Sequence, residues 1–464
     1  MDGINHPSQS VYWKVLGGAE EIGANSLYLN LGGTGIFIDA GLHPRLRNNH
    51  AFPALQFIED EQVDAMVLTH AHTDHVGGLP YLLKHHPYIK LIATPLTRDL
   101  SGIMLNNTIK LINQQVEKDM FSQDALSLYT SDTAEYIATV FDTVQYREQY
   151  AIQGKRGLSE VLCTFHDAGH IPGSAGISLQ WNGLSMFHTG DVQFKNQALI
   201  PGANFPRHHV DILFCESTNG SVDSIDMEKQ RDRAELARFI NRISNQNGSI
   251  LIPAFALGKT QEILTILHEL QKKGAIPHLP IYTGGMGKKI SSVIDRYCYT
   301  SPRMQPGFEI ADIPQIDIPY DELERAPFFS QPSIVVASSG MMNPGTISYK
   351  LAHSWMQKRN FGIAFIGWQE PESPGYALMH SELQQPFLFG NHKLKRVCAI
   401  ERYRFSAHAD KEDLIEFITD VKPKVLVLLH GDEDACESLA YSVSQILDEQ
   451  TRILLPMTGK RYSL

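Results

Sequence analysis

The segment THAHTDHVGG at residues 69–78 limits the possible folds of this chain more than any other feature. It directly follows the apolar run VDAMVL (63–68), so its side chains stand at the carboxyl end of a buried strand, where α/β folds commonly place their sites. Three imidazoles and a carboxylate lie close together there: His70, His72, Asp74 and His75. Zinc prefers nitrogen and oxygen ligands of this kind. The density of the cluster therefore predicts a metal site rather than a histidine-rich surface loop.

Polar residues after other apolar runs can complete such a site. His170 lies in a Gly-flanked turn, DAGHIPGS, while Asp191 ends HTGD and His430 follows VLL. Each of these alone is equally well explained as a turn residue that bonds to backbone groups. Taken with the first segment, they predict a site at strand ends that is assembled from distant parts of the chain.

The order of the expected elements indicates two domains. At 464 residues the chain is too long for one ordinary core. The first 220 residues contain many short strands. Amphipathic helices then alternate with apolar strands, with helices expected at 225–244, at 259–274 and around 351–359. A helix–strand pair follows at 410–421 and 424–431. Because histidine turns lie at both ends of the chain, this order suggests one domain interrupted by an inserted α/β domain.

Composition narrows the class of protein. No apolar run approaches the roughly 18 residues that cross a bilayer, and the N-terminus lacks the features of a secretory signal, so we expect a cytoplasmic protein without membrane contact. The five cysteines are scattered and form no CxxC pair, which argues against a thiolate zinc site. The net charge of -11 means that any groove that binds nucleic acid must be locally basic. Binding of nucleic acid there should weaken as salt rises.

The motifs HxHxDH, GHxPGS and TGD, in that order, strongly resemble the metallo-β-lactamase hydrolases. The resemblance begins at LGGAEEIGANS (16–26) and FIDAG (37–41) and continues through Asp191. It implies an αββα sandwich, and it implies that Asp39 supports the site without binding metal.

Later motifs resemble the β-CASP branch of that superfamily, whose nucleases include the pre-mRNA 3′-end-processing endonuclease and RNase J. These motifs are CESTNG (215–220), IPAFALGKTQEIL (252–264), ASSGMMNPG (337–345), RFSAHAD (404–410) and LLHGDE (428–433). The resemblance implies an α/β fold with a metallo-β-lactamase domain at 1–220, a β-CASP insertion at 221–396, and completion of the first domain at 397–464.

The resemblance also assigns the ligands of two Zn²⁺ ions. One ion would be held by His70, His72, His170 and Asp191, and the other by Asp74, His75, His430 and the shared Asp191. Among the catalytic residues it implies, Asp74 would steer the nucleophile and His408 would be the general acid, a role that suits imidazole near neutral pH. Glu216 would hold His408 in its charged form.

The substrate is expected to be single-stranded RNA, since DNA-repair relatives typically carry Val where this chain has His430. Five residues are expected to bind it: Ser338, Ser339, Gly340, Lys259 and Ser373. The chain departs from the family pattern at Asn219, where Tyr is usual, at Lys259, where Arg is common, and at Tyr376, where relatives carry Arg.

The sequence thus predicts a zinc-dependent ribonuclease, endonucleolytic or exonucleolytic. Two alternatives stay open, a DNA nuclease of the same fold and a weakly active or partner-dependent scaffold subunit of an RNA-processing complex. A homodimer or other protein partners are also left open.

Overall fold

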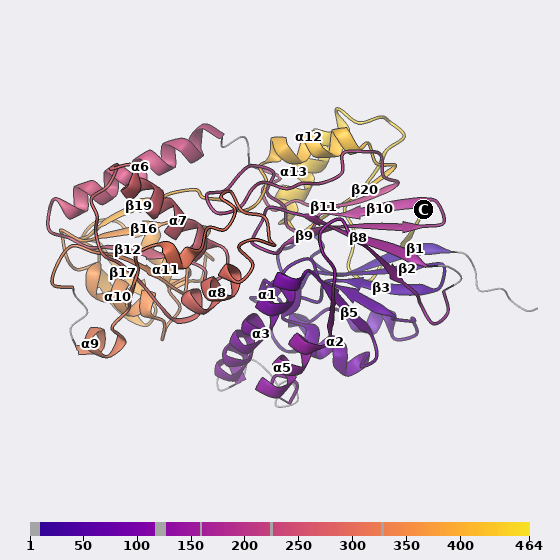
Figure 1. Cartoon of the computed structure of the whole chain (residues 1–464), viewed down its shortest axis with the longest axis horizontal. Coiled ribbons are helices and arrows are strands. Elements are labelled where there is room, and N and C mark those ends of the chain that lie inside the picture. The colour runs from indigo at the N-terminus through magenta and orange to yellow at the C-terminus, as the bar shows by residue number, and fades with distance from the viewer. Residues whose placement is uncertain (1–9, 117–126, 158–159, 223–225, 326–328) are drawn as a thin grey trace, which may run out of the picture. The chain divides into compact units, whose positions relative to one another are not determined.

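The computed structural model describes residues 10–116, 127–157, 160–222, 226–325 and 329–464. The chain divides into two compact units (Figure 1). The first unit contains Met1–Asn196, Gly202–Ser224 and His408–Leu464, and the second contains Gln197–Pro201 and Ile225–Ala407. The polypeptide therefore leaves the first unit, forms the second and returns.

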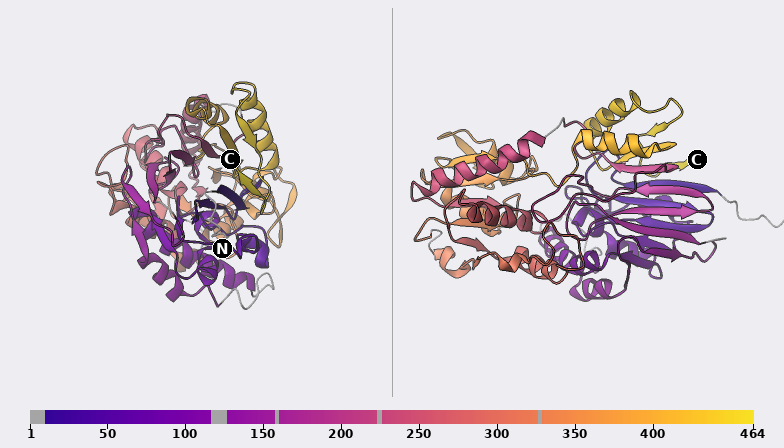
Figure 2. Two further views of the ribbon diagram at one scale, coloured as in Figure 1. Left: turned by 90° about the vertical axis from the view of Figure 1, so that its right-hand side faces the viewer. Right: turned by 45° about the horizontal axis from the view of Figure 1, so that its top comes forward.

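Two seven-stranded sheets form the centre of the first unit. In spatial order the first sheet contains β22 (Arg461–Ser463), β1 (Val11–Gly17), β2 (Ser26–Leu31), β3 (Thr34–Ile38), β4 (Ala65–Val67), β5 (Lys90–Ala93) and β6 (Phe141–Thr143). The second contains β21 (Arg452–Leu454), β20 (Val425–Leu429), β11 (Ile212–Glu216), β10 (Leu184–His188), β9 (Ala175–Trp181), β8 (Val161–Asp167) and β7 (Gln149–Ile152). Figure 2 shows the two sheets lying face to face.

Buried apolar side chains join these sheets into one core. Trp13 from the first sheet meets the ring of Phe214 from the second edge-on, with 5.7 Å between ring centroids. On its other face the second sheet packs against α12 (Lys411–Val421) and α13 (Glu433–Ser444), with Phe417 and Leu439 in a second apolar cluster. The other helices that the described residues of this unit form are α1 (Thr73–Val76), α2 (Leu79–His85), α3 (Pro95–Val116) and α5 (Ser131–Thr139), with short 3₁₀ turns η1 (Asn48–Ala51) and η2 (Leu55–Ile58).

Parallel pairing brings several strand ends of the first unit to one edge. β10, β11 and β20 run parallel, and Glu216 at the end of β11 is in register with Leu429, the residue before His430. β3 and β4 are also parallel, so Asp39 and the histidine segment leave their sheet together. Residues that are far apart in sequence thus meet because their strands end at the same level.

The second unit is an α/β domain built on a six-stranded sheet. In spatial order its strands, paired in parallel throughout, are β14 (Ile316–Asp317), β13 (Ile281–Thr283), β15 (Ile334–Ala337), β12 (Ile250–Pro253), β16 (Gly362–Phe365) and β19 (Ala399–Arg402). Its helices are α6 (Asp226–Ser244), α7 (Lys259–Lys272), α8 (Gly285–Asp295), α9 (Tyr320–Arg325), α10 (Ile347–Trp355), α11 (Pro374–Met379) and the 3₁₀ turn η3 (Ile310–Asp312), and β17 (Pro386–Phe389) pairs with β18 (His392–Lys395).

The predicted α/β fold, an αββα sandwich with an inserted domain, is confirmed. One helix begins earlier than expected: the sequence predicts a helix around 351–359, whereas α10 begins at Ile347 and ends at Trp355. The reason is local: the Thr346 side chain accepts a hydrogen bond from the backbone N–H of Tyr349 and starts the helix earlier. Among the described residues, no helix is long and apolar enough to cross a membrane.

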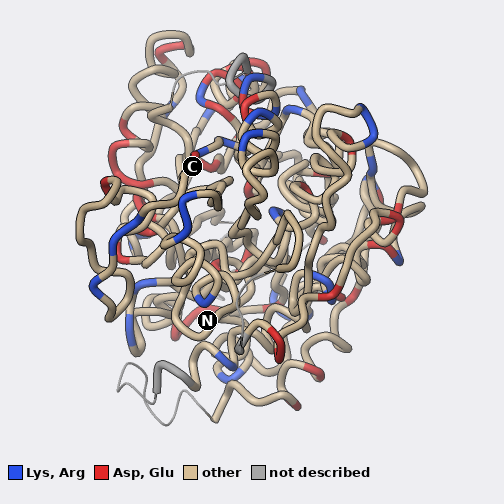
Figure 3. Tube along the Cα trace, turned by 90° about the vertical axis from the view of Figure 1, so that its left-hand side faces the viewer, with Lys and Arg blue, Asp and Glu red and all other residues tan. Residues whose placement is uncertain are grey.

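Charged residues of both signs are interspersed along the chain. The 40 Lys and Arg are outnumbered by 51 Asp and Glu, and Figure 3 shows both kinds scattered over the trace. Any surface that binds phosphate must therefore depend on the local placement of donors and not on the overall charge.

Candidate metal centre

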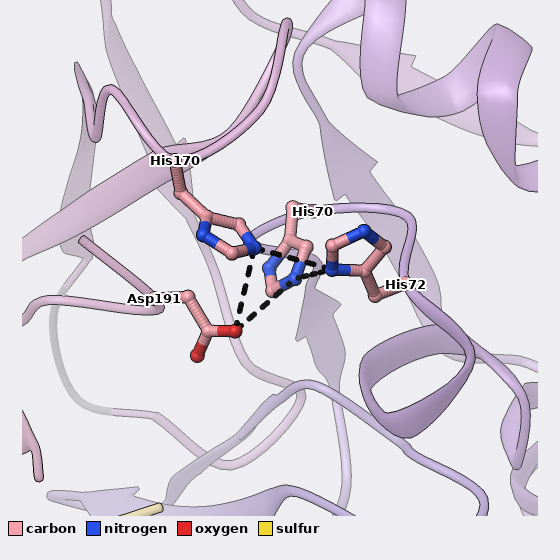
Figure 4. A group of neighbouring side chains, drawn as sticks. All are labelled: His70, His72, His170 and Asp191. Atoms are coloured by element: carbon pink, nitrogen blue, oxygen red, sulfur yellow. Dashed lines mark hydrogen bonds and ion pairs between the residues drawn. The ribbon is translucent and has the colours of Figure 1, made fainter. Parts of the chain in front are cut away.

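Four side chains that follow the ends of three strands, β4, β8 and β10, converge in the first unit (Figure 4). Nδ1 of His72 lies 3.1 Å from Nε2 of His70 and 3.1 Å from Nε2 of His170. Oδ2 of Asp191 lies 3.5 Å from Nε2 of His70 and 3.6 Å from Nε2 of His170. Three of these residues are buried, and His72 is partly exposed. The four ligand atoms thus form a compact group of three nitrogens and one oxygen.

This spacing fits a bound zinc ion. Ligand atoms about 2.0–2.1 Å from a tetrahedral zinc lie about 3.3 Å from one another, close to the four distances found here. Burial keeps the pKa of His70 well below its usual range, and the neighbouring imidazoles lower it further. His70 is consequently neutral, as a metal ligand must be.

A second group shares Asp191. Nε2 of His75 lies 3.4 Å from Oδ1 of Asp191 and 3.8 Å from Oδ2 of Asp74. The ring of His430 lies between the two carboxylates, with Nε2 3.4 Å from Oδ2 of Asp74 and Nδ1 3.0 Å from Oδ1 of Asp191. One oxygen of Asp191 therefore faces each group, which is the arrangement that a bridging carboxylate needs.

Two observations support a cation in this second group. Within the described part of the chain, Asp191 Oδ1 is buried and accepts no well-formed hydrogen bond, although imidazole nitrogens surround it. A cavity of about 20 Å³ lies beside it, lined in part by His75, Glu216 and His430. A space of this size holds a single water-sized particle.

The carboxylates and imidazoles of this second group shift one another's pKa. Burial would raise the pKa of Asp191, but the imidazoles of His430 and His75 hold it well below its usual range. Burial would lower the pKa of His430, yet Asp191 and Asp74 raise it to about 10, and the carboxylates around His75 raise its pKa well above the usual value. Without a cation, protons on the two imidazoles balance the carboxylates.

Asp39 supports the centre from behind the ligands. Its side chain accepts hydrogen bonds from the backbone N–H and the hydroxyl of Thr69, at 2.8 and 2.7 Å, and its Oδ2 lies 2.7 Å from Nδ1 of His75. This contact leaves Nε2 of His75 for the centre and fixes the orientation of the ring. Asp39 thus lies next to the candidate ligands, and none of the candidate metal-binding groups among the described residues includes it.

Glu216 and His408 form a pair beside both groups. Nδ1 of His408 lies 3.0 Å from Oε2 of Glu216, whose other oxygen accepts the backbone N–H of Val192. Burial would lower the pKa of His408, but the Glu216 carboxylate raises it. Atoms of Asp191, Glu216, His408 and His430 also lie close enough to hold an ion themselves. This geometry allows His408 to be a proton donor or a ligand.

Sequence reasoning gave no role to three neighbours of these residues. Nδ2 of Asn25 lies 3.0 Å from Nε2 of His75, and Oγ1 of Thr218 lies 3.2 Å from Nδ1 of His430. Nδ2 of Asn219 donates to the carbonyl oxygen of Ala409, at 3.0 Å, next to His408. Asn25 lies within the LGGAEEIGANS motif, which was the available signal.

The five predicted substrate-binding residues lie in the second unit, and several have structural partners. Nζ of Lys259 donates to the carbonyl oxygen of Phe405. Ser373 is 7% exposed and caps α11, its hydroxyl accepting the backbone N–H of Tyr376 at 3.0 Å. The hydroxyl of Ser339 accepts from the N–H of Asn343. Ser338, Ser339 and Gly340 follow β15 directly, and the role of all five in substrate binding stays a prediction.

Three family models match successive parts of the chain. The metallo-β-lactamase superfamily matches residues 20–218, the Beta-Casp domain 260–378, and the Zn-dependent metallo-hydrolase RNA specificity domain 393–454. The order of the three matches is that of a domain with an insertion.

Curated relatives match along almost the whole chain. Cleavage and polyadenylation specificity factor 73 of Drosophila melanogaster is 28% identical over 93% of this chain, which spans 61% of that protein. Transcription termination factor FttA of Methanocaldococcus jannaschii is 28% identical over 97% of this chain and 72% of its own length. The RNase J-like protein of the same organism is 26% identical over 97% of this chain and 99% of its own length.

A solved structure has the same fold. The crystal structure of a protein of unknown function from Enterococcus faecalis V583 superimposes with a TM-score of 0.57 at 15% identity and covers 98% of this chain and 100% of that one. The fold, the three matched domains and the full-length relatives agree with the resemblance in the motifs. The chain is a metal-dependent hydrolase of the metallo-β-lactamase superfamily and belongs to its β-CASP branch.

Proposed function

We propose that this protein is a ribonuclease that hydrolyses phosphodiester bonds of single-stranded RNA with two Zn²⁺ ions per chain. The observation that carries the proposal is the position of Asp191, which directs one carboxylate oxygen to each of two groups of ligand atoms. The names of the relatives, which include an RNase J-like protein, support RNA as the substrate.

The ligand sets support two ions. His70, His72 and His170 would hold one ion together with Asp191, and Asp74, His75 and His430 would hold the other with the same carboxylate. When bound, zinc ions lower the pKa of water and neutralise charge on the phosphate oxygens.

The protein's own residues would supply the orientation and the proton. The Asp74 carboxylate, with its side chain 24% exposed, can orient the attacking water. Glu216 holds Nδ1 of His408, and Nε2 is the atom that would protonate the departing oxygen of the RNA. Burial would lower the pKa of His408, but the Glu216 carboxylate raises it, which favours the protonated ring that a general acid needs.

The test compares matched substrates. Purified protein, stripped with chelator and reloaded with zinc, is incubated with RNA and DNA of one sequence, labelled at the 5′ or the 3′ end. We expect zinc-dependent cleavage that favours RNA and weakens as salt rises, because phosphate contacts release counterions. Equal or faster cleavage of DNA would favour a DNA nuclease of the same fold, and no cleavage with zinc bound would favour a scaffold subunit.

The label positions decide a further point. Internal fragments indicate an endonuclease, whereas mononucleotides indicate an exonuclease and show its polarity. A cytoplasmic location and a homodimer or other protein partners stay predictions, the latter testable by measuring the mass of the purified protein in solution.

A further inference from the structure

Two exposed aromatic side chains stand at the carboxyl ends of neighbouring strands in the second unit. Phe255 follows β12 and is 37% exposed, and Trp368 follows β16 and is 56% exposed. β12 and β16 pair directly and in parallel, so both loops leave the sheet at the same edge. Open parallel sheets bind their ligands at this edge.

Hydrogen bonds hold the backbone of the loops that carry Phe255 and Trp368. The carbonyl oxygen of Phe255 accepts from the N–H and the hydroxyl of Thr260, at 3.0 and 2.8 Å. The side-chain amide of Gln369, next to Trp368, donates to the carbonyl oxygen of Gly340 at 3.1 Å. A Cβ on Gly340 would lie 3.2 Å from a ring atom of Phe255. Phe255 therefore lies beside Gly340, and the residue after Trp368 is bonded to the same glycine. Such hydrogen-bonded loops limit the entropy lost when a ligand binds.

The same loops carry residues that the sequence predicts to bind substrate. Ser338, Ser339 and Gly340 follow the adjacent strand β15, and Ser373 ends the loop of Trp368. Within that loop Glu372 is exposed and Glu370 partly so. Two carboxylates disfavour a phosphate beside the indole, whereas an uncharged planar ring can stack on it.

We propose that Phe255 and Trp368 form a stacking platform for the bases of single-stranded RNA, an inference that rests on the proposed function. Each aromatic ring offers a face to one base. Because every base has a π face, the platform would hold RNA with little regard to sequence. Duplex RNA, whose bases are already stacked, would not engage it.

Tryptophan fluorescence can report on the platform directly. Of the four tryptophans, only Trp368 is exposed, since Trp13, Trp181 and Trp355 are at most 7% exposed. Single-stranded RNA mixed with the full chain in a stopped-flow instrument, before cleavage proceeds, should quench this fluorescence. Duplex RNA of the same length should quench it much less. Trp368→Phe should abolish the quenching and keep nearly full affinity, because it retains an aromatic face.

Truncation measures the contribution of each ring. Trp368→Ala and Phe255→Ala should each weaken RNA binding about 5- to 150-fold, with little change in hydrolysis of bis-p-nitrophenyl phosphate, which has no base. Tyr299→Ala, which removes an 82% exposed ring beyond α8 in the same unit, should leave affinity unchanged. Phe255→Leu preserves apolar volume if the alanine variant does not fold.

The outcomes separate the two proposals. If wild-type protein cleaves RNA while Trp368→Ala and Phe255→Leu bind it with full affinity, the platform is wrong and the proposed function stands. If wild-type protein neither binds nor cleaves RNA with zinc present, the proposed function fails, and the platform fails with it. Quenching that persists in Trp368→Phe would also overturn the platform.

Discussion

Nδ1 of His408 lies 3.0 Å from Oε2 of Glu216, and the two residues come from positions 192 apart in the chain. The pairing engages Nδ1 of His408, so a proton donated to a substrate would come from Nε2. Proximity of His408 to Asp191 and His430 would also permit metal binding. The two roles predict different behaviour when the imidazole is removed.

His408→Ala should leave zinc content and folding intact and should slow RNA cleavage about 10²–10⁴-fold, the cost of losing a general acid. Bis-p-nitrophenyl phosphate has a leaving group that needs little protonation, so its hydrolysis should slow much less. Metal analysis and steady-state kinetics on both substrates check this. Loss of zinc, or equal slowing of both substrates, would make His408 a ligand or a structural residue.

Glu216→Gln should change the pH profile of RNA cleavage. Burial alone lowers the pKa of His408, and the Glu216 carboxylate is the main cause that raises it. A general acid acts while protonated, so activity falls as pH rises through its pKa. Removing the carboxylate's charge lowers that pKa and should move the alkaline decline to lower pH. An unchanged alkaline limb would show that Glu216 does not control the protonation of His408.

Asn219 should act as a positioning residue for His408. Its amide donates to the carbonyl oxygen of Ala409 at 3.0 Å and to that of His408 at 3.4 Å. Asn219→Ala should slow RNA cleavage about fivefold, the net value of one hydrogen bond. Asn219→Asp, of nearly equal shape, should be slower still because a carboxylate faces two carbonyl oxygens. Hydrolysis of the activated substrate should change little, and equal slowing of both substrates would contradict positioning.

One part of the candidate metal centre could be predicted from the spacing of residues in the sequence alone. His70, His72, Asp74 and His75 form a cluster too dense to be accidental, and one strand end places them together. His170, Asp191 and His430 are single residues in ordinary turns, and their roles came from the resemblance of whole motifs. The alternation of expected strands and helices in the middle of the chain also predicted the inserted α/β domain.

Contacts between distant segments could not be read from spacing. The partners of Asn219 lie 189 and 190 residues further along the chain. Likewise the carbonyl oxygen bound by Lys259 lies 146 residues away, and the sequence offers no signal for it. The start of α10 was also not predicted correctly, because the Thr346 side chain caps the helix before the expected first residue.

Asp191→Ala should remove zinc from both groups, and activity should be lost with it, because this carboxylate contributes an oxygen to each. His72→Ala should lower zinc from about two ions to about one, since its Nδ1 faces the first group only. Metal analysis after gel filtration checks both. His166→Ala is the control, because this histidine of the same unit bonds to Ser178 at 2.9 Å and should keep full zinc.

Zinc binding to the metal-free protein should release protons at neutral pH. Burial lowers the pKa of His430, but nearby Asp191 and Asp74 raise it to about 10, and the pKa of His75 is likewise raised well above its usual value. Both rings are therefore protonated near pH 7 without metal, and both must lose a proton to become ligands. Titration calorimetry in buffers of different ionisation enthalpy should report release of about two protons per chain.

The stability of the metal-free protein should follow the same groups. A histidine whose pKa is raised by folding stabilises the fold fully below its unfolded pKa, about 6.5, and loses that contribution as pH rises through the folded value. For His430 this places the loss between about pH 6.5 and 10. Zinc replaces the missing positive charge, so the increase in Tm on zinc addition should grow as pH rises through this range. The prediction fails if the increase in Tm is constant with pH and no protons are released. In that case zinc does not displace protons from these imidazoles, and they are not its ligands.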